Sequence, residues 1–111
     1  MSILSSEIDG AFVVIPNGRL DTNNHAEAEA LVLAHISSGE EKVIFDFSKT
    51  DYISSAGLRV VLVTAKKVRA KGALALCNAN EQVGEVLEIS GFLDVMQHFD
   101  SLQEALAFVK G

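Results

Sequence analysis

The alternation of apolar and polar positions along the chain predicts a succession of short strands and amphipathic helices. Two runs near the start, ILSSEI and AFVVIP, are separated by Asp9-Gly10, and this pair favours a hairpin turn because both positions tolerate positive φ. Further along, KVIFDF and ALALC are short, mostly apolar runs typical of buried strands. We therefore expect strands at 3–8, 11–16, 42–47 and 73–77.

Apolar residues at helical spacing predict four helices. The second begins at Ser54 or Ser55, ends at Lys71-Gly72, and has an expected buried face of Leu58, Val61, Leu62, Ala65 and Val68. The others cover 26–36, about 81–89, and a segment that follows a cap at Asp100 or Ser101. Capping boxes are expected for Asn24 with Glu27 and for Ser101 with Glu104, and Gly91 is expected to adopt a left-handed cap conformation. A short strand is expected between Phe92 and Phe99.

This order of elements, a hairpin followed by alternating helices and strands, is typical of an α/β fold with a largely parallel sheet. We expect one domain over residues 1–111, in which four to five strands form a mixed sheet covered by about four helices. Sites in such sheets lie beyond the carboxyl ends of the strands, where helices begin. The strand KVIFDF leads to Ser54-Ser55 at that edge, so topology alone directs attention to this serine pair.

Composition and charge exclude several classes of function. The net charge is −6 and the sequence pI is near 4.9, which disfavours binding to nucleic acid. Cys77 is the only cysteine, and its apolar surroundings indicate an inert buried thiol. The first residues do not resemble a signal peptide, and no apolar run approaches the roughly 20 residues that span a bilayer. A cytoplasmic protein without membrane insertion is expected.

Motifs for catalysis are missing. The serine pair lacks the G-x-S-x-G pattern of a nucleophile elbow, and the spacing of His25, His35 and His98 does not mark any of them as a base. Phosphate-binding glycine loops are absent as well. Asp21, Asp46 and Asp51 could meet at one sheet edge and hold magnesium, but this is the weaker interpretation. We expect neither an enzyme nor a cofactor.

The serine pair itself admits two interpretations. One serine could simply be a helix N-cap, which is worth about 1 kcal/mol. Alternatively, a hydroxyl is displayed for modification, since the small residues Ala56 and Gly57 leave the helix start open to a partner. A phosphate there would meet the positive end of the helix dipole, so the modified protein should stay folded. Residue types alone leave the two interpretations about even.

The segment from Tyr52 to Leu58, YISSAGL, resembles the signature of STAS domains, and specifically that of the bacterial anti-sigma factor antagonists. The resemblance extends over nearly the whole chain. It includes the Gly18-Arg19-Leu20-Asp21 segment, the approach KVIFDFSKTDYI, and Gly91-Phe92. Alignment on Gly57-Leu58 implies that the phosphorylated serine of the family corresponds to Ser55. Ser54 stands where the family has aspartate, so the selectivity of a kinase for this site could differ.

The resemblance implies a STAS-like fold and a partner switch. The unphosphorylated protein would bind an anti-sigma factor serine kinase with a histidine-kinase-like ATPase fold, and so release a sigma factor. Phosphorylation of Ser55 would end this binding, and a PP2C-type phosphatase would restore it. Alternatively, Ser54 or neither serine is modified, and the protein is a non-switching STAS subunit of a transporter or signalling assembly. The implied partner-binding residues are Asp21, Ser54, Ser55, Ala56, Gly57 and Leu58. Two of them have an alternative role: Asp21 could instead cap the first helix, and Leu58 could instead belong to the core.

Overall fold

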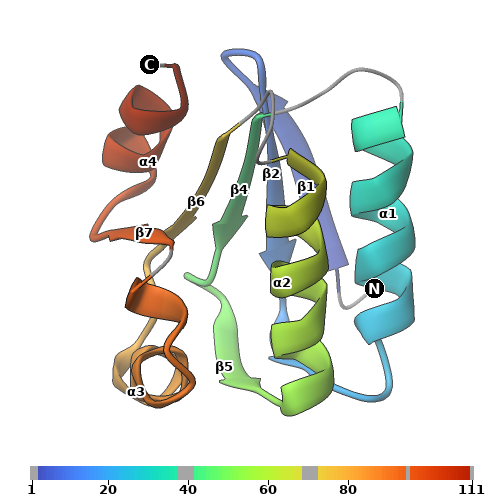
Figure 1. Cartoon of the computed structure of the whole chain (residues 1–111), viewed down its shortest axis with the longest axis vertical. Helices are drawn as coiled ribbons and strands as arrows, with labels where there is room; N and C mark the ends of the chain where they lie inside the picture. The colour runs from blue at the N-terminus through green and yellow to red at the C-terminus, as the bar shows by residue number, and fades with distance from the viewer. Residues whose placement is uncertain (1–2, 38–41, 69–72, 95, 111) are drawn as a thin grey trace.

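Figure 1 shows the computed structural model of the chain, which describes residues 3–37, 42–68, 73–94 and 96–110. Two short strands, Gly18–Leu20 and Thr50–Ile53, were not expected from the sequence; the other strands and helices follow the expected order. The elements are β1 (Ile3–Ile8), β2 (Ala11–Pro16), β3 (Gly18–Leu20), α1 (His25–Ser37), β4 (Lys42–Asp46), β5 (Thr50–Ile53), α2 (Ser55–Val68), β6 (Ala73–Cys77), α3 (Glu81–Ile89), the 3-10 helix η1 (Phe92–Asp94), β7 (Gln97–Phe99) and α4 (Leu102–Lys110).

The main sheet has five strands in the order β1-β2-β4-β6-β7. Only β1 is antiparallel to its neighbour, because β2, β4, β6 and β7 run parallel to one another. The hairpin between β1 and β2 turns at Asp9 and Gly10, whose φ angles of 52° and 83° are both positive. The expected α/β fold, with a mixed five-stranded sheet and four helices, is confirmed.

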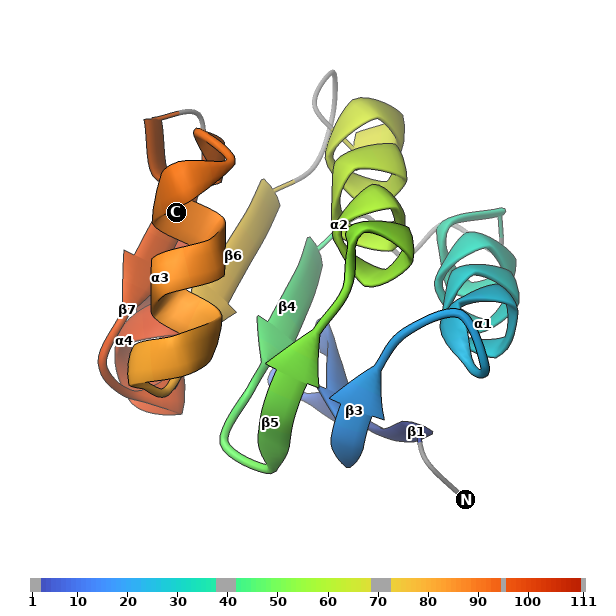
Figure 2. The same ribbon diagram turned by 90° about the horizontal axis from the view of Figure 1, so that it is seen from below.

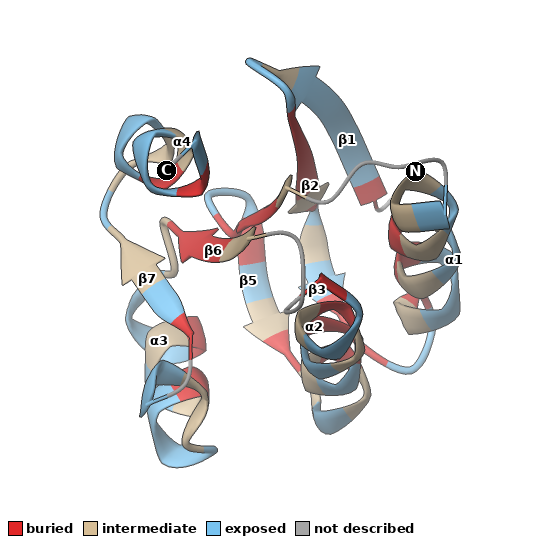
Figure 3. Ribbon diagram, turned by 45° about the horizontal axis from the view of Figure 1, so that its top comes forward, coloured by how far each residue is buried: buried red, intermediate tan, exposed pale blue. Residues whose placement is uncertain are grey.

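Successive residues of the central strands face opposite sides of the sheet and form two apolar cores. On one side, Phe12 and Phe45 belong to the larger core, which also contains Val32 of α1 and Val60 of α2. On the other side, Ile44 packs in a smaller core with residues of α4. Figure 3 shows β2 and β6 largely buried between these layers, whereas β1 at the sheet edge is largely exposed.

A second, two-stranded sheet was not expected from the sequence. β3 and β5 run parallel, and Arg19 and Leu20 pair with Tyr52 and Ile53, respectively. The Thr50 hydroxyl anchors this small sheet by donating a 2.6 Å hydrogen bond to the Pro16 carbonyl at the end of β2. Figure 2 shows β3 and β5 side by side below the main sheet, where they lead into α1 and α2. The small sheet therefore sets the positions of both helix starts.

Two details of the expected helices were wrong. Leu62 was expected in the buried face of α2 but is 37% exposed, and Val60 is fully buried instead. The capping box at Asn24 is not formed, since its side-chain oxygen accepts from the Asp21 amide and its side-chain nitrogen donates to the Arg19 carbonyl. The expected stop of α2 at Lys71-Gly72 lies outside the described residues.

The expected features at the carboxyl-terminal end agree better with the structure. Gly91 follows α3 with a φ of 82°, which confirms its left-handed conformation. The segment after it forms η1 and the short strand β7, which joins the edge of the main sheet. The Ser101 hydroxyl accepts from the Glu104 amide at 3.1 Å and donates to its carboxylate at 3.3 Å, so Ser101 caps α4 as expected.

Candidate functional site

The two serines at the start of α2 have different roles. The Ser54 hydroxyl accepts a 3.2 Å hydrogen bond from the Gly57 amide, and the Ser54 carbonyl accepts one from the Leu58 amide at 2.9 Å. These are the bonds of an N-cap residue. The Ser54 amide donates in turn to the Leu20 carbonyl at 2.9 Å, so the cap is tied to the small sheet. Ser54 is therefore the structural residue of the pair.

Ser55 is the first residue of α2, and its side chain is exposed. Its hydroxyl makes no hydrogen bond to any other residue that the structure describes. Among the same residues, no histidine or carboxylate bonds to it as the base of a nucleophilic serine would. The hydroxyl lies at the positive end of the helix dipole, where an added negative charge is favoured. Ser55 can therefore accept a covalent group without losing any local contact.

Gly57 explains why the chain is so close-packed beneath this serine. The glycine is buried, and a Cβ at its position would lie 2.5 Å from the Leu20 carbonyl oxygen and 2.9 Å from side-chain carbons of Leu20 and Ile53. Only a residue without a side chain allows α2 to approach the small sheet this closely. Leu58 is half-buried and packs against the larger core. Gly57 and Leu58 thus face inward, and Ser55 lies on the surface.

Asp21 follows β3 and lies close to the cap, because its neighbour Leu20 contacts Ser54 and Gly57. Its side chain is only 12% exposed. One carboxylate oxygen accepts from Arg19 Nε at 2.9 Å, and the other accepts from the Asn23 amide at 3.0 Å. These two hydrogen bonds hold the pKa of the Asp21 carboxyl below its ordinary value. The Asp21 carbonyl also accepts from the His25 amide at the start of α1.

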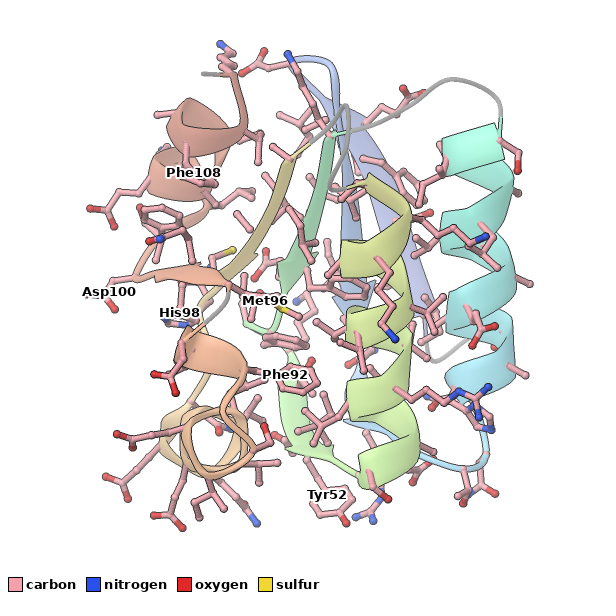
Figure 4. The ribbon with its side chains drawn as sticks, viewed as in Figure 1. Tyr52, Phe92, Met96, His98, Asp100 and Phe108 are labelled. Atoms are coloured by element: carbon pink, nitrogen blue, oxygen red, sulfur yellow. The ribbon has the colours of Figure 1, made fainter. Side chains whose placement is uncertain are left out.

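Arg19 and Tyr52 were not identified as site residues from the sequence. The Arg19 guanidinium carbon lies 4.3 Å from the centre of the Tyr52 ring, a cation–π arrangement. Figure 4 shows Tyr52 at the lower end of the molecule, beside the first turn of α2. Both residues were within the segments that carry the family resemblance. Their contact depends on the pairing of β3 with β5, which no local pattern indicated.

Other chemistry considered from the sequence finds little support. Among the described residues, no group of three or more His, Cys, Asp or Glu side chains is placed to hold a metal ion, and Asp21, Asp46 and Asp51 form no such group. Cys77 is buried as expected, and burial, with the nearby Asp46 carboxylate, raises the pKa of its thiol to about 12. In the described part of the chain, every helix is too short or too polar to cross a membrane.

Comparison with known proteins identifies the class to which this fold and site belong. Residues 2–105 match the STAS domain family, and the chain belongs to that family. A relative from Bordetella bronchiseptica, named as the anti-sigma factor antagonist BtrV, is 40% identical over 111 residues, which cover 99% of this chain and 96% of the relative. The resemblance inferred from the signature around Ser55 is thereby confirmed.

Solved structures share the same fold. A Thermotoga maritima protein described as an anti-sigma factor antagonist superposes with a TM-score of 0.92 at 23% identity, covering 98% of this chain and 95% of that one. The Bacillus cell fate determinant SpoIIAA in its phosphorylated form superposes with a TM-score of 0.77 at 22% identity, covering 96% and 98% of the two chains. At these identities the similarity concerns the fold.

Proposed function

We propose that this protein is an anti-sigma factor antagonist that is switched by phosphorylation of Ser55. In its unphosphorylated form it binds an anti-sigma factor with a histidine-kinase-like ATPase fold, and the sigma factor held by that ATPase is released. The name of the Bordetella relative supports the general role. The structure of SpoIIAA in a phosphorylated form supports the use of this fold as a phosphoprotein.

The observation that carries the proposal is the division of roles between Ser54 and Ser55. Ser54 caps the helix, and the Ser55 hydroxyl is exposed and makes no hydrogen bond to the residues that the structure describes. A phosphate there would gain the favourable field at the helix start and break no existing bond. It would add a charge of about −1.5 to −2 to a surface that a partner must desolvate on binding. Each 1.4 kcal/mol lost in this way weakens binding about tenfold.

In this scheme the protein is a substrate and a ligand, and it performs no catalysis. The kinase transfers the γ-phosphoryl group of ATP to Ser55 Oγ, with loss of the hydroxyl proton and formation of ADP. A PP2C-type phosphatase hydrolyses the ester to serine and inorganic phosphate. The proposal requires the protein to act in the cytoplasm, where ATP and RNA polymerase are found. Serine in place of aspartate at position 54 makes Ser54 the second candidate for modification.

The proposal is tested by capture of the partner from the native cell with immobilised protein. Wild type should retain a histidine-kinase-like ATPase, and Ser55→Asp should retain at least tenfold less of it. The purified ATPase with ATP and magnesium should add one phosphate to wild type and to Ser54→Ala, but none to Ser55→Ala, as measured by intact mass. Circular dichroism of each variant serves as the folding control.

Three results would count against this function. Equal phosphorylation of Ser55→Ala would move the modified residue elsewhere. Equal capture by wild type and Ser55→Asp would show that charge at this position does not control binding. Capture of a transporter ATPase by both forms would favour the alternative of a non-switching STAS subunit.

A further inference from the structure

The small sheet that leads into α2 displays a cation, Arg19, whose position is fixed from two sides. Arg19 and Tyr52 are partners in the β3–β5 register, and the guanidinium carbon lies 4.3 Å from the centre of the ring. Arg19 Nε donates to the Asp21 carboxylate at 2.9 Å. The ring limits movement in one direction and the carboxylate limits it in another. A guanidinium held in this way loses little conformational freedom when it binds a partner.

Arg19 also retains most of its capacity to donate hydrogen bonds. Of the five N–H groups of a guanidinium, only the one on Nε is used, and the four on Nη1 and Nη2 make no bond within the described part of the chain. The Arg19 side chain is 62% exposed, whereas that of Asp21 is 12% exposed. Of Arg19 and Asp21, Arg19 is therefore the one that a partner can reach.

We propose that Arg19 is a specificity-determining contact of the partner-binding face, and that it binds a carboxylate of the docked ATPase. Tyr52 and Asp21 are its positioning residues. This differs from the two roles considered for Asp21 from the sequence, which were a contact with the kinase and a cap of the first helix. The inference rests on the proposed function, since it names the chemistry by which the same partner is recognised.

The positive charge of Arg19 favours a carboxylate as the group recognised, even though the chain as a whole is acidic. The chain has 15 acidic and 9 basic residues, so an acidic patch of another protein is repelled by most of this surface. Because Tyr52 and Asp21 hold Arg19 in place, Arg19 offsets that repulsion only for a partner that places a carboxylate directly opposite its guanidinium. Arginine also matches the planar geometry of a carboxylate with two parallel hydrogen bonds, which lysine cannot do.

The proposal is tested with the purified ATPase that wild type captures. Arg19→Gln should weaken binding about tenfold to a hundredfold, as expected for loss of charge-assisted hydrogen bonds. It should raise KM for phosphorylation of Ser55 while leaving kcat nearly unchanged, because Arg19 makes no bond to the reacting hydroxyl among the described residues. Binding of Arg19→Gln should also depend less on salt than that of wild type. Lys67→Gln is the matched control, since it removes the same charge about 18 Å along α2 from Ser55.

The positioning role is tested at Tyr52. Tyr52→Leu removes the ring and should weaken binding about twofold to fivefold, whereas Tyr52→Phe keeps the ring and should bind like wild type. In the free protein, the Arg19 Nε–H signal in NMR should exchange with water faster in Tyr52→Leu than in Tyr52→Phe. Thermal unfolding of both variants controls for loss of fold.

The outcomes separate this inference from the function on which it rests. If Ser55→Asp abolishes binding but Arg19→Gln binds within twofold of wild type, the role of Arg19 is wrong and the switch stands. An equal loss in Lys67→Gln, or an unchanged salt dependence in Arg19→Gln, likewise overturns the recognition of a carboxylate by Arg19. Equal binding of the ATPase by wild type and Ser55→Asp overturns the switch itself.

Discussion

Replacement of the two serines by alanine should have opposite effects. Ser54→Ala should lower the free energy of unfolding and leave phosphorylation intact, whereas Ser55→Ala should abolish phosphorylation and leave the free energy of unfolding nearly unchanged. Ser54→Ala removes the hydroxyl that accepts from the Gly57 amide. N-cap replacements of this kind cost about 0.5–2 kcal/mol. The bond here is 3.2 Å long, at the weak end of the usual range, so we expect a loss of about 1 kcal/mol in the free energy of unfolding.

Ser55→Ala should change the free energy of unfolding by less than about 0.5 kcal/mol, since the hydroxyl is exposed and makes no hydrogen bond among the described residues. Alanine also has the higher helix propensity, which favours a small gain. For a chain of 111 residues, the entropy of unfolding near 60 °C is about 0.23 kcal/mol/K. The loss in Ser54→Ala thus corresponds to a fall in Tm of about 4 °C.

The assay is urea denaturation followed by circular dichroism, combined with thermal melts of wild type, both single variants and the double variant. The two substitutions should be additive within about 0.5 kcal/mol, because only Ser54 contributes to the cap. A larger destabilisation by Ser55→Ala than by Ser54→Ala would show that Ser55 is the capping residue. The Ser55 hydroxyl would then be engaged in the cap and not free for modification.

Two further changes test the packing and the pH response. Gly57→Ala should lower the free energy of unfolding by about 1–3 kcal/mol in denaturant melts, because its Cβ would meet the backbone oxygen of Leu20. The control is Gly84→Ala in α3, whose Cβ would meet open space and which should raise the free energy of unfolding by about 0.5–1 kcal/mol. Equal effects of the two substitutions would contradict the close approach of α2 to the small sheet. His98 accepts a 3.2 Å hydrogen bond from the Ala79 amide through Nε2, and burial lowers its pKa below 6.5. The unfolded chain therefore takes up the proton first, and the contribution of His98 is complete above about pH 6.5 and lost as the pH falls toward its folded pKa. Urea melts between about pH 5 and pH 8 should show this loss in wild type and not in His98→Gln, and parallel curves would refute it.

Most elements of the fold could be predicted because their signals are local. The Asp9-Gly10 turn, the apolar run of β4 and the helical spacing in α2 each lie within a few neighbouring residues. The small sheet could not be predicted in this way. β3 has three residues and β5 has four, and their pairing joins segments about 30 residues apart. Leu62 was expected to be buried but is exposed, because the spacing of apolar residues in α2 does not by itself show how wide the buried face of the helix is.

The helix start at the serine pair was predictable from the sequence, but the division of roles between the two serines was not. Both serines are good capping residues, and the sequence contains no signal that assigns the cap to one of them. The assignment follows from the Leu20 carbonyl, which accepts from the Ser54 amide and so fixes where α2 begins. The contact of Arg19 with Tyr52 depends on the same strand pairing. A contact that depends on two strands was missed, whereas the helix start within one motif was predicted.

The close approach of Gly57 to Leu20 has a consequence for how such proteins diverge. The buried contact of Gly57 with Leu20 fixes the position of the first turn of α2 against the small sheet. The exposed side chains on the outer surface are therefore not needed to hold the helix start in place. Positions 19, 52 and 55 can then be exchanged with little compensation in the interior. Duplicated copies of one gene could acquire separate partners through a few surface substitutions, while the buried framework they inherit stays unchanged.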